Sequence, residues 1–117
     1  MSNKEREIAG LEHRIEAAKG AIAHAEDVRK LLGNKLFRDV ILQKFCVEHC
    51  ARYVQESGDP LLSAENRADA LNMAQAAGHL RRWLDLAIRM GESEAGLLPS
   101  IQEELDTVRA EPEDDEE

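Results

Sequence analysis

Cys46, His49 and Cys50 are the residues whose types and spacing could carry chemistry. On a helix these three positions share one face, and thiolate and imidazole groups are zinc ligands. A zinc site needs four ligands, usually as two short-spaced pairs from different elements. Only one such cluster is present, so the site would need a further ligand from one of His13, His24 and His79.

The order Cys-Val-Glu-His-Cys is not a haem-attachment motif. A regular helix seldom permits a disulfide between positions four residues apart. We therefore interpret both cysteines as buried structural thiols and assign no metal ligand and no cofactor. A metal-dependent enzyme built around this cluster is the third of three functional hypotheses.

Catalytic constellations are otherwise missing from the sequence. Asp39, Glu48, Asp69 and Asp85 occur singly, and there is no glycine-rich phosphate loop and no His-Glu-x-x-His motif. Catalysis needs a nucleophile with a base, or paired carboxylates in a pocket. We expect a protein that is not an enzyme, with no catalytic residues.

Arg82 and Trp83 are the predicted anchor for a protein partner, because arginine and tryptophan dominate the energetics of such contacts. The alternative is a solvated rim with Trp83 half-buried. A nucleic-acid partner is not expected, since the body of the chain lacks the basic face that phosphate binding requires.

The segment from Asn34 to Ser57 holds both phenylalanines, both cysteines and the tyrosine. Read as a helix over about 35–56, its apolar residues cover more than half of its circumference, whereas a surface helix needs a stripe of roughly 100°. Asn34 is a favoured N-cap, and Ser57-Gly58-Asp59-Pro60 is a stop signal. We expect other helices to cover this central helix on two sides.

A long leading helix is predicted over about 4–32. Apolar residues recur there at heptad spacing, which is typical of a coiled coil or bundle. We predict that the chain associates with itself through this seam, as a homo-oligomer. The predicted contact residues are Ile8, Leu11, Ile15, Ala18 and Ile22.

A third helix is predicted over about 64–90, capped by Ser63 and ended by Gly91, so that residues 1–91 form a helical core domain. Residues 92–99 have the composition of a linker. Ser100 and Glu103 fit a capping box for a short helix over about 101–109, followed by a disordered acidic tail. The predicted fold class is all-α, an antiparallel helical hairpin or bundle of three main helices.

The formal net charge of −9 is unevenly distributed. Residues 92–117 carry one arginine against eleven acids, whereas residues 1–91 are close to neutral. We expect no signal peptide and no membrane span, because no apolar run approaches 18 residues. The expected location is the host cytoplasm or a virion, with protein partners and no membrane partner.

Four stretches together suggest a family: K-L-F-R-D-V-I-L, F-C-V-E-H-C-A-R-Y-V, D-P-L-L and L-N-M-A-Q-A-A-G-H-L-R-R-W-L. Their order resembles small helical proteins encoded near the virion-structure genes of tailed bacteriophages, over roughly residues 30–90. The chain departs from that pattern at Asn34-Lys35, where the type often has Asn-Pro, and in its two cysteines.

The resemblance implies a structural or assembly role and brings no catalytic motif. We expect a non-enzymatic interaction or assembly protein, most simply a phage virion or morphogenesis component. The alternative is a small phage-encoded inhibitor that binds a host protein through its acidic C-terminal region.

Overall fold

The computed structural model describes residues 2–112, and every regular element in that range is a helix. The fold class is therefore all-α, as predicted. The chain divides into two compact units. Unit 1 combines residues 1–27 with residues 87–117, and unit 2 comprises Val28–Leu86.

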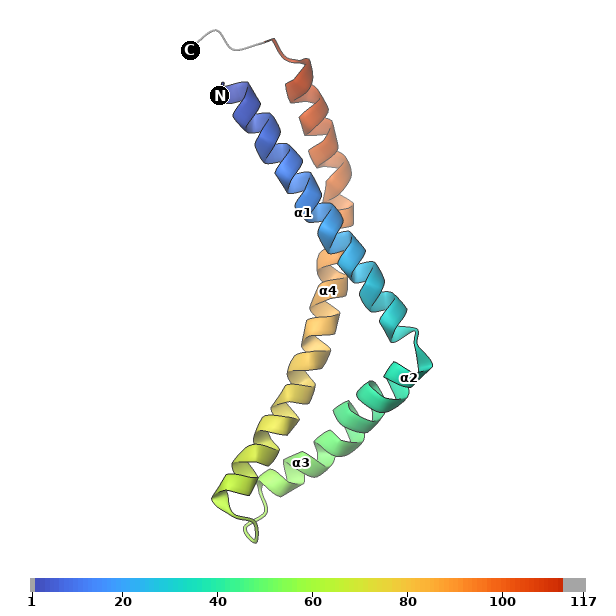
Figure 1. Ribbon diagram of the computed structural model, residues 1–117, viewed down its shortest axis with the longest axis vertical. Helices are drawn as coiled ribbons and strands as arrows, with labels where there is room; N and C mark the ends of the chain where they lie inside the picture. Colours follow the sequence, from blue (N-terminus) through green and yellow to red (C-terminus); the bar gives the residue numbers. More distant parts are fainter. Residues whose placement is uncertain (1, 113–117) are drawn as a thin grey trace. The chain divides into compact units, whose positions relative to one another are not determined.

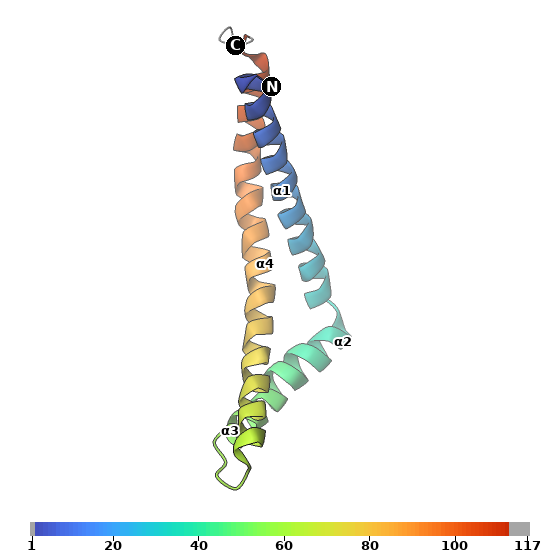
Figure 2. The same ribbon diagram turned by 60° about the vertical axis from the view of Figure 1, so that its left-hand side comes forward.

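Unit 1 is an antiparallel helix pair. It is formed by most of α1 (Asn3–Leu32) and the C-terminal half of α4 (Ala64–Ala110), which run side by side in Figures 1 and 2. At the ends of the chain, Lys4 Nζ donates to the carbonyl oxygen of Glu111 over 2.6 Å. Arg109 forms an ion pair with Glu12 at 2.8 Å, and Arg14 forms one with Glu94 at 2.7 Å.

The two helices meet along heptad seams. The heptad spacing of the leading helix predicted such a seam, and in unit 1 its partner is α4 of the same chain. On α1, Ile15, Ala18 and Ala25 are buried, while Ile8, Leu11 and Ile22 are partly buried. The facing residues of α4 alternate at spacings of four and three, which keeps them on one side of a helix. They are Ala87, Gly91, Glu94, Leu98, Ile101, Leu105 and Val108.

Gly91 marks the closest approach of the two helices. A Cβ placed on it would lie 2.2 Å from the Cβ of Ala25 and 3.1 Å from the carbonyl oxygen of Ala21. Only glycine fits opposite this turn of α1. The residue expected to end the third helix instead lets α4 pack against α1.

The predicted break after Met90 was therefore wrong. α4 continues through the expected linker at 92–99 and includes the expected short helix at 101–109, with Pro99 inside it. Glycine and proline lower helix propensity by about 1 and 3 kcal/mol, but the seam from Ala87 to Val108 offsets this loss by burying apolar side chains. The domain boundary predicted at residue 91 falls inside unit 1. The predicted acidic tail lies mostly outside the described residues.

Unit 2 contains the remaining elements. These are the last turn of α1, a short α2 (Lys35–Phe37), a π-helical η1 (Arg38–His49), α3 (Cys50–Ser57) and the first half of α4. Asn34 Oδ1 accepts a hydrogen bond from Phe37 N at 3.0 Å, and Ser63 Oγ accepts one from Asn66 N at 3.1 Å. Both predicted N-caps are thus confirmed. α3 ends at Ser57, where the stop was predicted.

η1 is wound as a π-helix, whose i→i+5 hydrogen bonds include the one from Cys50 N to Phe45 O. A row of five residues, each four positions apart, is partly buried along this segment: Phe37, Ile41, Phe45, His49 and Tyr53.

Candidate interaction surfaces

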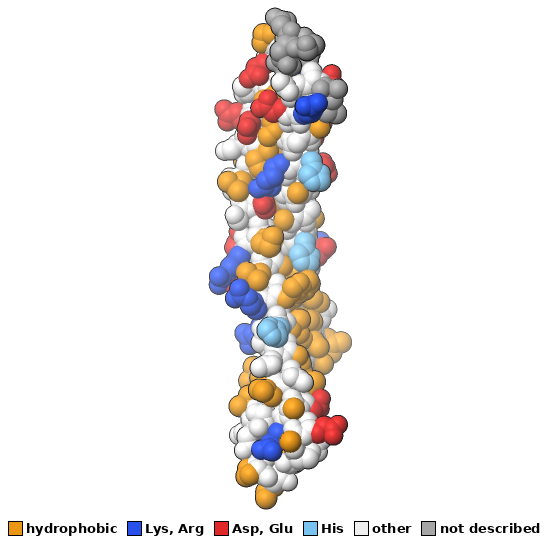
Figure 3. Space-filling view, turned by 90° about the vertical axis from the view of Figure 1, so that its left-hand side faces the viewer, with side chains coloured by type: hydrophobic (Ala, Val, Ile, Leu, Met, Phe, Trp, Pro, Cys, Tyr) orange, Lys and Arg blue, Asp and Glu red, His pale blue; other side chains and the backbone are white. Residues whose placement is uncertain are grey.

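Many large apolar side chains lie at the surface of the described chain, while its interior mixes alanine with isoleucine, leucine and valine. Five of the eleven buried hydrophobic residues of the described chain are alanines, and no large side chain there is fully buried. Figure 3 shows hydrophobic side chains reaching the surface between charged ones on the face it presents. The exposed large residues are Leu31, Leu36, Val40, Val47, Val54, Leu61, Leu71, Trp83, Leu86, Met90 and Leu97.

The central helix accounts for four of these exposed residues. The side bearing Cys46 faces α4, but Leu36 is 72% exposed and Val40, Val47 and Val54 are about half exposed. The expectation that other helices cover this segment on two sides was wrong. Within the described chain only one side is covered, because a helix pair has a single interface.

Residues 28–52 of unit 2, named here the basic segment, combine exposed apolar residues with positive charge. They carry six Lys/Arg against two Asp/Glu, a net of +4. Leu31, Leu36, Val40 and Val47 lie exposed among these charges. Lys35 is paired with Asp39 at 2.5 Å, and Arg38 Nη1 donates to the carbonyl oxygen of Leu32 over 3.1 Å.

The charge of the whole chain separates by unit. In the described residues unit 1 has six Lys/Arg and twelve Asp/Glu, a net of −6, and unit 2 has nine and seven, a net of +2. When the charges are counted by position in the sequence, they suggest a neutral body with an acidic tail. When they are counted by packing unit, they give an acidic helix pair and a weakly basic unit.

The residues predicted for self-association lie in the seam of unit 1. Ile15 and Ala18 are buried and Ile8, Leu11 and Ile22 are partly buried, against α4 of the same chain. The heptad pattern correctly located a packing face, and the chain fills that face itself. Self-association remains a prediction, and it needs another surface while this seam is occupied.

The predicted anchor residues lie on α4 within unit 2. Trp83 is 55% exposed and Arg82 is exposed. Trp83 is therefore accessible to a partner, but a half-exposed tryptophan fits the solvated rim as well, and the anchor role stays a prediction.

Met90 and Leu97 were not singled out from the sequence. They are exposed and seven residues apart on α4, and Glu104 follows at the same spacing. The predicted linker hid this row, since its spacing has meaning only in a continuous helix. An uninterrupted heptad count from Ala87 to Val108 could have revealed it.

Both cysteines were predicted to be buried; both thiols face α4, where Cys46 is buried and Cys50 is partly buried. Cys46 Sγ donates to Ala77 O over 3.8 Å and Cys50 Sγ to Ala74 O over 3.7 Å. Burial raises the pKa of the Cys46 thiol; the nearby Arg81 opposes this effect and Cys50 adds to it. A raised pKa disfavours the thiolate that a metal ligand or nucleophile requires.

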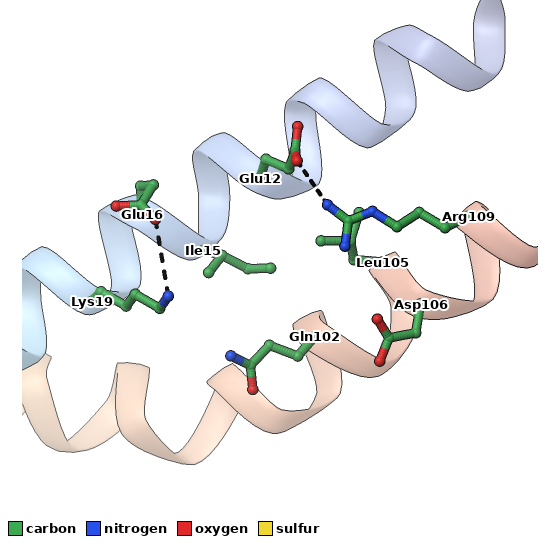
Figure 4. Close-up of a pocket in the computed structure, with 8 residues that line it drawn as sticks. All are labelled: Glu12, Ile15, Glu16, Lys19, Gln102, Leu105, Asp106 and Arg109. Atoms are coloured by element: carbon green, nitrogen blue, oxygen red, sulfur yellow. Dashed lines mark hydrogen bonds and ion pairs between the residues drawn. The ribbon is translucent and has the colours of Figure 1, made fainter.

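A groove of about 620 Å³ lies between the helices of unit 1. Its apolar residues are Ile15 and Leu105, and Figure 4 shows Glu12 and Arg109 reaching toward each other beside it. Lys19 lies 4.0 Å from Glu16. The remaining polar residues are Gln102 and Asp106. This set offers charge for recognition but no nucleophile paired with a base.

Among the described residues no group of three or more His, Cys, Asp or Glu side chains could hold a metal ion. The described helices also lack a stretch long and apolar enough to cross a membrane. Comparisons with protein-family models, with curated proteins and with solved structures found no match.

Proposed function

We propose that this chain is a non-enzymatic interaction or assembly protein and that the basic segment of unit 2 carries its main binding surface. The observation that supports this proposal is the number of large apolar residues at the surface of the described chain. Alanines make up five of its eleven buried hydrophobic residues, while Leu36, Val40 and Val47 face solvent. Where exposed apolar residues form a patch rimmed by charged ones, they commonly mark a protein-binding surface.

A virion or morphogenesis role is the setting suggested by the resemblance to phage proteins, and we propose it on that ground. An adjacent portal or capsid gene would strengthen it. Neighbouring genes unrelated to virion structure would count against this setting while leaving the interaction role intact.

Photo-crosslinking tests the interaction role. A photoreactive amino acid replaces Leu36 in cells that produce the chain naturally, and a matched chain carries it at Leu61, which is 92% exposed but lies in the loop before α4. We expect a discrete adduct from position 36 and none from position 61. If position 36 gives no adduct, or only the adducts that position 61 gives, the proposed binding surface is wrong.

Truncation of the chain distinguishes the inhibitor hypothesis from the assembly hypothesis. In that hypothesis the acidic C-terminal region binds the host protein, so ending the chain after Arg109 should abolish the adduct. In the assembly hypothesis, with a partner bound at the basic segment, the adduct should persist when the truncated chain is produced beside the full-length chain. The truncated chain retains every residue of the segment, and the full-length chain retains residues 110–117.

A further inference from the structure

The basic segment has a complementary surface in the same protein. In unit 1 the C-terminal half of α4 presents Met90 and Leu97, which are 58% and 48% exposed. The described residues 103–112 carry four Asp/Glu against one arginine, a net of −3. Both surfaces thus combine exposed apolar side chains with charge, and the charges have opposite signs.

We infer that the partner of the basic segment is a second copy of this chain, bound through the acidic half of its α4. In this contact Met90 and Leu97 of one copy pack near Leu36 and Val40 of the other. Glu103 and Glu104 approach the cations of the basic segment. The inference rests on the proposed function and identifies its partner.

Several charged side chains are available for this contact. Glu103 and Glu104 are exposed, and neither carboxylate takes part in the ion pairs of unit 1. Lys44 is exposed on η1, and Arg38 is exposed and donates to a backbone carbonyl among the described residues. Complementary charges of this kind accelerate association and select the partner.

The contact joins two different surfaces, so it is heterologous. Repeating it either closes a ring or extends a series of copies. The heptad seam of α1 is not consumed, and each copy keeps its own unit 1 intact. Such a contact suits an assembly role better than a contact that joins only two copies.

Charge reversal in the purified full chain tests the inference by sedimentation equilibrium at about 0.05 M and about 0.5 M salt. One variant carries Arg38→Glu with Lys44→Glu, a second carries Glu103→Lys with Glu104→Lys, and a third carries all four changes. We expect each pair alone to weaken association at low salt by about tenfold, and the four together to restore it to within about threefold. Circular dichroism verifies that each variant is folded.

The matched control is Arg6→Glu with Lys19→Glu in unit 1. It changes the net charge as much as the first variant does, but it makes the acidic unit more acidic. We expect its association to equal or exceed that of the unmodified chain. General repulsion between copies predicts the opposite, with the control weakened and the Glu103→Lys, Glu104→Lys variant strengthened.

A chain that stays monomeric at high concentration and low salt overturns the inference. Failure of the variant with all four substitutions to associate overturns it too. The same is true if the variants rank by net charge alone. These outcomes differ from failure of the proposed function. A monomeric chain could still give an adduct with another protein at position 36, whereas a missing adduct removes the surface itself.

Discussion

At the residue scale, Gly91 decides how closely the helices of unit 1 approach. Gly91→Ala would place a methyl group 2.2 Å from the Cβ of Ala25. Overpacking of this kind costs about 1–3 kcal/mol, more than the roughly 1 kcal/mol gained in helix propensity. We expect a lower free energy of unfolding by urea titration, and a smaller loss when Ala25→Gly is added.

Gly96→Ala is the matched control, because a Cβ at Gly96 meets nothing within 4 Å. It should raise the free energy of unfolding by about 0.5–1 kcal/mol through helix propensity alone. Equal effects of the two substitutions would contradict a close helix contact at Gly91.

The Cys46 thiol leads to a prediction of how the stability of the folded chain depends on pH. Because its pKa in the folded chain is raised above the ordinary value of 9.0, the folded state holds the thiol proton more firmly than the unfolded state. The stability linked to this proton is fully present below about pH 9 and is lost as the pH rises above it. Thermal unfolding should therefore lose stability above pH 9 more steeply in the unmodified chain than in Cys46→Ala.

Cys50→Ala provides the comparison for that measurement and should keep the steep alkaline loss. If Cys46→Ala and the unmodified chain lose stability in parallel above pH 9, the thiol is not the group responsible.

At the element scale, the continuity of α4 is the feature that sequence patterns could not reveal. The caps at Asn34 and Ser63 were predictable, because a capping side chain acts on its own first turn. Gly91 and Pro99 are equally local stop signals, yet packing against α1 outweighs them. A local pattern cannot show which partner helix will compensate for a poor helix former.

Pro99→Ala tests that continuity. Within a helix the change should raise the free energy of unfolding by about 1–3 kcal/mol, because alanine restores the backbone donor and helix propensity. In a flexible linker it would have little effect or a slightly destabilising one. Urea unfolding of the two chains distinguishes these cases.

The sequence predicted a helix over about 35–56 but not its π-helical winding, although the partly buried row from Phe37 to Tyr53 runs through it. We expect Phe45→Ala, within that row, to lower the free energy of unfolding by about 2–3 kcal/mol, somewhat below the range for a fully buried phenylalanine. Val47→Ala on the exposed side should change it by less than about 0.5 kcal/mol in dilute solution. A large effect at Val47 under those conditions would mean that this side is covered within the single chain.

At the scale of the whole molecule, the division into two units predicts which segments unfold locally together. Most packing contacts fall within a unit, although α1 and α4 each contribute to both. Segments that pack together tend to open together. The charges follow the same division, so the acidic and basic surfaces belong to different packing units.

Hydrogen exchange can test whether the units open separately. Gly91→Ala perturbs the contact between α1 and α4 in unit 1 only. We expect faster amide exchange over residues 3–27 and 87–110, with protection retained at Cys46, Cys50 and Ala77 of unit 2, where thiol contacts join η1 and α3 to α4. If exchange instead accelerates equally in both units, the chain unfolds as one cooperative body, and the acidic surface cannot open while the basic segment stays folded.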